Sequence, residues 1–230
     1  MTKIRAVIFD MFNTLVEDGD SYWMSTFDHI VDNQGLNISG RDLRNEWIIF
    51  DEEYRSIRGK DEFPFYSYNQ AWISSFSKVY EQLGLDADTN SSIKTIIDDI
   101  GQKPMFADTI SCLRQLAPAY RIAVLSNADD RFLYPVVDRM EVQFEEIMAS
   151  EEARCYKPSP KIFWDMLGRL QISPDECMYV GYRQLEDVQG PREIGMLTAW
   201  INRGQTPLDP TLISPDYTIR NLLQIVDLLA

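Results

Sequence analysis

Residues 4–14 read Ile-Arg-Ala-Val-Ile-Phe-Asp-Met-Phe-Asn-Thr, an apolar and partly β-branched run that ends at Asp10. Such a run is typical of a strand buried in a parallel sheet. Ligands of α/β proteins bind beyond the carboxyl ends of these strands. A carboxylate there suits nucleophilic attack with a covalent ester intermediate. Asp10 is therefore the first candidate catalytic residue, although an acid that only caps the turn after a strand would look the same.

The chain from residue 104 onward alternates between strand and helix patterns. We predict strands at 121–126, 144–149, 177–181, 197–201 and 216–219, and helices at 107–117, 130–140, 160–170, 187–195 and 220–229. This alternation is typical of right-handed βαβ units that build one parallel sheet. The sequence therefore predicts an α/β fold with a Rossmann-like core.

The chain between the first strand and this alternating part has a different character. Aromatic and aliphatic residues recur there at helical spacing, as in Trp23 and Phe27, then Trp47 and Phe50, and a last helix is predicted near residues 91–100. We expect a helical insert at 17–103, with residues 1–16 and 104–230 forming the core. Most of the insert's aromatic rings are expected to pack in its own interior.

Composition narrows the classes of partner. The chain has 230 residues and a net charge of -14, which repels nucleic-acid backbones and anionic lipid. One histidine and three cysteines without a C-x-x-C pair argue against a zinc site. No apolar stretch is long enough to span a bilayer. We expect a cytoplasmic protein with a small-molecule substrate and no nucleic-acid or membrane partner, either monomeric or a homodimer.

Polar residues follow three further predicted strands. Ser126 and Asn127 could hold an oxygen of an anionic substrate or orient a carboxylate, or they could simply begin a loop and cap a helix. Lys157 could neutralise carboxylates at the same edge of the sheet, or be a solvated loop lysine. Asp187 is predicted to open the helix at 187–195, where an acid also complements the helix dipole. Each signal alone has an ordinary structural explanation, but all of them are expected at one edge.

The order of these segments carries a resemblance. Asp-x-x-x-Thr (Asp10, Thr14) is followed by Val-Leu-Ser-Asn, then Lys-Pro-x-Pro, then Val-Gly-x-x-x-x-x-Asp-Val-x-Gly. In this order the chain resembles the haloacid dehalogenase superfamily, and its insert resembles that superfamily's α-helical cap. The resemblance implies that Asp10 forms an aspartyl ester, that Ser126 binds the transferring group and that Lys157 steadies negative charge.

Two positions depart from the superfamily's Mg²⁺-dependent phosphatases. Those enzymes carry an acid two residues after the nucleophile and another directly after the fourth-motif glycine. This chain has Phe12 and Tyr182 there. Phe12 cannot move a proton, and a neutral phenol is a poor ligand for a hard cation. We expect no cofactor, or weakly bound Mg²⁺ on Asp10 and Asp187 alone.

An aromatic residue two positions after the nucleophile is similar to the 2-haloacid dehalogenases, which need no metal because halide leaves without a proton. Phe12 and Tyr182 are then expected beside the substrate. The substrate carboxylate or the halide would need an arginine, for which Arg41, Arg44 and Arg55 are candidates. The resulting prediction is a metal-independent, 2-haloacid dehalogenase-like hydrolase. The alternatives are a diverged Mg²⁺-dependent small-molecule phosphatase and a non-catalytic metabolite-binding homologue.

Overall fold

The computed structural model describes residues 3–60 and 63–230. The chain divides into two compact units. The core unit comprises Met1–Glu17, Pro104–Asn127 and Val137–Ala230, and the helical unit comprises Asp18–Lys103 and Ala128–Val136.

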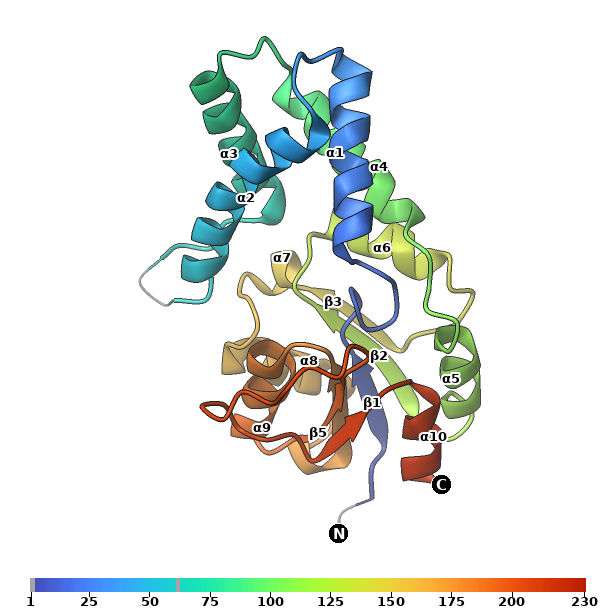
Figure 1. Cartoon of the computed structure of the whole chain (residues 1–230). Coiled ribbons are helices and arrows are strands. Elements are labelled where there is room, and N and C mark those ends of the chain that lie inside the picture. The colour runs from blue at the N-terminus through green and yellow to red at the C-terminus, as the bar shows by residue number, and fades with distance from the viewer. Residues whose placement is uncertain (1–2, 61–62) are drawn as a thin grey trace. The chain divides into compact units, whose positions relative to one another are not determined.

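The core unit is built on a parallel sheet, drawn as arrows in Figure 1. The described strands are β1 (Ala6–Phe9), β2 (Arg121–Ser126), β3 (Glu146–Ala149), β4 (Cys177–Gly181), β5 (Leu197–Ile201) and β6 (Tyr217–Ile219). Their order is β3-β2-β1-β4-β5-β6, and every pairing is parallel. This confirms the α/β fold with a parallel sheet. β1 lies in the middle, so the chain that follows it starts at the centre of the sheet's carboxyl edge.

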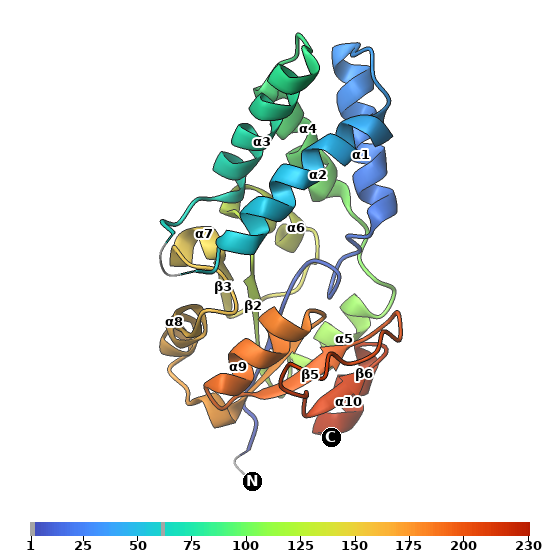
Figure 2. The same cartoon turned by 60° about the vertical axis from the view of Figure 1, so that its left-hand side comes forward.

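Helices cover both faces of this sheet (Figures 1 and 2). α5 (Thr109–Leu116) and α10 (Leu223–Leu229) lie together on one face, while α8 (Pro160–Leu170) and α9 (Gly190–Glu193) lie on the other. Alternate residues of each strand face opposite sides, and Ile8 faces the α8 side, where it joins a buried cluster with Phe163 and Met166. The short elements α7 (Ser150–Ala153) and η1 (Pro174–Glu176) complete the unit.

Two predicted helices begin elsewhere than expected. The helix predicted at 187–195 begins earlier, as a π-helical turn η2 (Gln184–Gln189) that runs into α9. The Asp187 carboxylate accepts the backbone N–H of Arg183 at 2.8 Å, which draws the chain into a turn before Asp187. The helix predicted from residue 220 begins at Leu223, because the Gln224 side chain takes the backbone N–H groups of residues 220 and 221.

The helical unit consists of α1 (Asp20–Gln34), α2 (Gly40–Ile57), α3 (Tyr68–Leu83) and α4 (Thr89–Gln102), together with the first part of α6 (Asp130–Asp138). Its interior is aromatic, as expected. Trp47 packs against Phe27 and Phe76 with ring centroids 5.2 and 5.8 Å apart. Gly35 and Gly84 end α1 and α3 in the left-handed conformation that glycine adopts without strain.

A buried carboxylate joins α6 to this unit. Asp129, fully buried, accepts the backbone N–H groups of Tyr68 and Asn69 at 2.8 and 2.7 Å. These are the first residues of α3, whose N–H groups have no partner within the helix. The carboxylate therefore caps α3 and holds residues 128–136 within the helical unit.

Throughout residues 3–60 and 63–230, we find no helix with the length and apolarity that crossing a membrane requires.

Candidate functional site

Asp10 lies one residue beyond β1, at the carboxyl edge of the sheet. Its backbone N–H continues the sheet ladder by donating to the Val180 carbonyl at 2.9 Å. One carboxylate oxygen, Oδ1, accepts the Ser126 hydroxyl at 2.9 Å, and Oδ2 accepts the Thr14 hydroxyl at 3.1 Å. All three side chains are buried. The carboxylate is thus fixed from two sides before any substrate arrives.

The turn after Asp10 keeps Thr14 in reach. The backbone N–H groups of Thr14 and Leu15 both donate to the Met11 carbonyl. Asn13 takes a left-handed backbone conformation, with φ at 60°, which asparagine tolerates better than most residues. The chain therefore folds back at once, and the Asp-x-x-x-Thr spacing becomes a direct hydrogen bond.

Lys157 supplies a buried positive charge to the same carboxylate. Its Nζ lies 3.0 Å from Asp10 Oδ1 and 2.6 Å from Asp187 Oδ1. Burial disfavours the charged ammonium, but the negative charges of Asp10 and Asp187 outweigh burial and raise the pKa of Lys157 well above its ordinary value. Lys157 is therefore a permanent cation that two acids share.

Asp187 lies between the ammonium and the polypeptide backbone. Oδ1 takes the Lys157 ammonium and Oδ2 takes the backbone N–H of Arg183. Burial, together with the nearby charge of Asp10, raises the pKa of Asp187 against the opposing effect of Lys157. A Cβ atom on Gly181 would stand 2.4 Å from Asp187 Cγ. Glycine at the end of β4 is therefore what allows this carboxylate to pack against the sheet.

Asn127 is also beside Lys157, but its amide binds main chain. Nδ2 donates to the Lys157 carbonyl at 3.1 Å, and Oδ1 accepts the Lys157 backbone N–H at 2.8 Å. The amide therefore resembles a neighbouring peptide group that clamps the Lys157 loop. In this structure both polar atoms of the side chain serve that contact, and a role for the amide in substrate binding stays a prediction.

One further residue of the site was missed by the sequence analysis. The Tyr179 hydroxyl lies 2.8 Å from Lys157 Nζ and 2.7 Å from the Leu125 carbonyl. Tyr179 is fully buried in the middle of β4. A tyrosine within a run of strand residues reads as core, and only the pairing of β1 with both β2 and β4 brings its hydroxyl to the ammonium.

Phe12 and Tyr182 both lie in the core unit. Phe12 is half-buried and forms part of the turn after Asp10. The Tyr182 hydroxyl accepts Arg183 Nε at 2.7 Å, and its carbonyl accepts Trp200 Nε1 at 2.7 Å. Burial raises the pKa of Tyr182, so the phenol stays neutral and protonated near pH 7.

The three candidate arginines lie on α2 of the helical unit. Arg41 is exposed, Arg44 pairs with Asp20 at 2.8 Å, and Arg55 pairs with Asp51 at 2.5 Å. None of these contacts involves a residue of the core site. A role for any of them in substrate binding stays a prediction.

The residues at the site do not fit a divalent cation well. Such a cation needs several carboxylate or carbonyl oxygens. Here the Lys157 ammonium stands between the Asp10 and Asp187 carboxylates, and the remaining phosphatase ligand position holds the neutral phenol of Tyr182. In the described ranges 3–60 and 63–230, no three histidine, cysteine, aspartate or glutamate side chains are grouped as a metal site. A cation would therefore share both carboxylates with Lys157.

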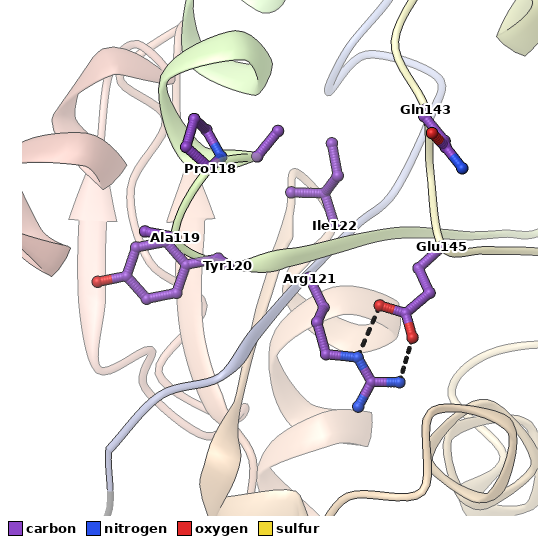
Figure 3. Close-up of a pocket in the computed structure, with 8 residues that line it drawn as sticks. Pro118, Ala119, Tyr120, Arg121, Ile122, Gln143 and Glu145 are labelled. Carbon is purple, nitrogen blue, oxygen red and sulfur yellow. Dashed lines mark hydrogen bonds and ion pairs between the residues drawn. The ribbon is translucent and has the colours of Figure 1, made fainter.

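A pocket of about 580 Å³ opens at the other end of the sheet. Figure 3 shows its lining around Arg121, which begins β2, and Glu145, which precedes β3. The Arg121 guanidinium binds the Glu145 carboxylate through two hydrogen bonds. This pocket lies at the amino ends of the strands, away from the edge where α/β sheets bind ligands, and none of the predicted site residues lines it.

Comparisons of the sequence with a family model and with known proteins agree on one family. A family model described as haloacid dehalogenase-like hydrolase matches residues 4–195. Haloacetate dehalogenase H-2 of Moraxella sp. (strain B) is 27% identical over the whole of both chains. Glyceraldehyde 3-phosphate phosphatase of Pyrococcus furiosus is 24% identical over the whole of this chain and 94% of its own. A dehalogenase and a phosphatase therefore both align with this chain over its whole length.

The fold comparison agrees. The solved structure of L-2-haloacid dehalogenase from Xanthobacter autotrophicus with chloropropionic acid covalently bound superposes with a TM-score of 0.77. The match covers 98% of each chain at 20% identity. At this identity the likeness shows the fold alone.

Proposed function

The chain belongs to the haloacid dehalogenase-like hydrolase family, and on that premise we propose that it is a metal-independent hydrolase that uses Asp10 as a carboxylate nucleophile on a short 2-haloacid. The observation that carries the proposal is the buried Asp10 carboxylate, held by Lys157, together with Phe12 and Tyr182 at the two positions where the phosphatases carry acids. The helical unit would then be the cap expected at residues 17–103.

In the first step, a carboxylate oxygen of Asp10 attacks the carbon that bears the halogen. The new C–O bond forms as the carbon–halogen bond breaks, and the halide leaves with the bonding electron pair. No proton is needed, so Phe12 is compatible with this step. Thr14 and Ser126 fix the carboxylate through hydrogen bonds, which favours reaction by orientation.

In the second step, water adds to the carbonyl carbon of the Asp10 ester. Asp187 takes the proton of that water, and its raised pKa suits a base that works near neutral pH. The negative charge that develops on the ester oxygen is stabilised by Lys157. As the adduct collapses, the bond between the carbonyl carbon and the alkoxide oxygen breaks and Asp187 returns its proton to that oxygen, which releases a 2-hydroxyacid. The Asp10 carboxyl gives up the second water proton to solvent and is a carboxylate again.

The test is halide release from 2-chloropropionate in the presence of EDTA. Asp10→Asn should lose activity, whereas Asp165→Asn, which removes an exposed acid paired with Lys161 on α8, should keep it. With enzyme in excess in ¹⁸O-labelled water, a single turnover should leave the label in Asp10, as read by peptide mass spectrometry. Label in the product alone would rule out the ester and overturn the proposal.

A second candidate, a Mg²⁺-dependent phosphatase, is favoured by the similarity to glyceraldehyde 3-phosphate phosphatase. Hydrolysis of an aryl phosphate with and without Mg²⁺ separates the two. Phosphate release that depends on Mg²⁺ and increases in Tyr182→Asp would support an eroded phosphatase. Tight binding of a metabolite without turnover of either substrate class would favour a non-catalytic homologue.

A further inference from the structure

The Lys157 ammonium makes three hydrogen bonds within the protein. Its acceptors are Asp10 Oδ1, Asp187 Oδ1 and the Tyr179 hydroxyl oxygen, at 3.0, 2.6 and 2.8 Å. An ammonium has three N–H groups and no acceptor. Every proton of this buried group therefore has a partner in the protein, and none remains for a substrate unless a partner is displaced.

The direction of the Tyr179 hydrogen bonds is fixed. The hydroxyl lies 2.7 Å from the carbonyl of Leu125, and a carbonyl can only accept. The phenol proton is thus given to Leu125, so the phenol oxygen accepts from Lys157. Burial raises the pKa of Tyr179 well above its ordinary value, against the lowering effect of Lys157, so the phenol keeps this proton at neutral pH.

The contact links three strands. Leu125 directly precedes Ser126 on β2, Tyr179 belongs to β4, and both strands pair with β1, which leads to Asp10. The Tyr179 ring also packs edge-to-face with Phe163, with 5.5 Å between the ring centroids. The phenol is therefore locked by its ring as well as by its hydroxyl.

We propose that Tyr179 is a positioning residue, which holds the Lys157 ammonium between Asp10 and Asp187 so that Lys157 acts through its charge and not as a hydrogen-bond donor to substrate. The catalytic part of this inference rests on the proposed function. The contact itself does not, and it can be measured without any substrate.

The substrate-free test uses proton exchange of lysine ammonium groups by ¹⁵N NMR. Lys103 and Lys157 are the two buried lysines in the described chain, so two slowly exchanging signals are expected, and Lys103→Arg identifies which is which. Tyr179→Phe, which keeps the ring, should speed exchange at Lys157 about tenfold or more, because a buried N–H loses its acceptor, and leave Lys103 unchanged. An unchanged Lys157 signal would overturn the inference.

The kinetic test compares two buried tyrosines. Tyr80→Phe removes a hydroxyl that bonds Ser92 at 2.6 Å in the helical unit and should leave kcat unchanged. Tyr179→Phe should lower kcat about tenfold to a hundredfold, with KM within about twofold, since a hydrogen bond to a charged group is lost at the reacting centre. Equal kinetics in the two variants would show only a structural role. If the wild type turned over no substrate, the proposed function would fail while the exchange experiment would still decide the contact.

Discussion

Glycine at position 181, the last residue of β4, determines where the Asp187 carboxylate lies. Gly181 leaves the space that Asp187 fills, and a Cβ atom there would overlap the carboxyl group. We therefore expect Gly181→Ala to displace Asp187 from Lys157 and to lower kcat about a hundredfold, which is the scale of loss for a misplacement near 1 Å.

The matched control is Gly168→Ala in α8, where a Cβ atom would meet nothing within 4 Å. This variant should keep wild-type kcat and a similar or higher melting temperature, because alanine favours helix over glycine. Wild-type turnover in a folded Gly181→Ala enzyme would show that the position of Asp187 does not matter for the reaction.

At the scale of residues, the sequence predicted a set of polar groups at one edge of the sheet, and Asp10, Ser126, Lys157 and Asp187 lie together there. Asp10 and Ser126 end apolar runs, whereas Lys157 and Asp187 lie in motifs on the loops between strands and helices. Tyr179 could not be found in this way, because it faces inward from the strand itself. Its hydroxyl lies beside Lys157 because of the register in which β4 pairs with β1, and a sequence pattern does not specify that register.

At the scale of elements, α3 depends on a residue far along the chain. Asp129 accepts the N–H groups of Tyr68 and Asn69. Asp129→Ala should destabilise the protein by about 2 kcal/mol, because it removes two charge-assisted hydrogen bonds at a helix N-terminus. Asp88→Ala, which removes one exposed capping bond to Asn90 in α4, should cost about 1 kcal/mol or less. Urea unfolding of both variants gives the comparison, and an equal loss would contradict it.

The strands and most helices were predicted to within a few residues, because periodicity and strand-end signals are local. Helix starts were predicted less well where a side chain from elsewhere sets the first turn. Gln224 delays α10 until Leu223, and the Asp187 carboxylate starts the η2 turn early. Such caps depend on rotamers, which a sequence pattern does not specify.

At the scale of the whole molecule, Asp187 should leave a signature in the pH dependence of stability. Its pKa is raised in the folded protein above an unfolded value of about 3.9. The folded state then binds more protons than the unfolded state, so the contribution of Asp187 is full below about pH 4 and is lost as pH rises through the folded pKa. The free energy of unfolding of the wild type relative to Asp187→Asn should therefore fall between about pH 4.5 and 8.

Glu176 provides a control, because its contribution to stability depends on pH in the opposite direction. The Arg5 hydrogen bond, followed by those from Ser173, lowers the pKa of Glu176 to about 2. Its contribution is present above the unfolded pKa of about 4.3 and is lost as pH falls toward 2. Relative to Glu176→Gln, the wild type should show no slope above about pH 5. If the free energy of unfolding of the wild type relative to Asp187→Asn instead rose between about pH 4.5 and 8, the pKa of Asp187 would not be raised in the folded protein.

The central position of β1 has a consequence for biosynthesis. Ala6 of β1 pairs with Arg121 on one side and Cys177 on the other, so β1 can pair with both neighbours only after more than 160 further residues have been made. At about 5–20 residues per second, an emerging apolar segment stays unpaired on the ribosome for several seconds at least. Chaperones are therefore expected to bind the nascent chain at β1.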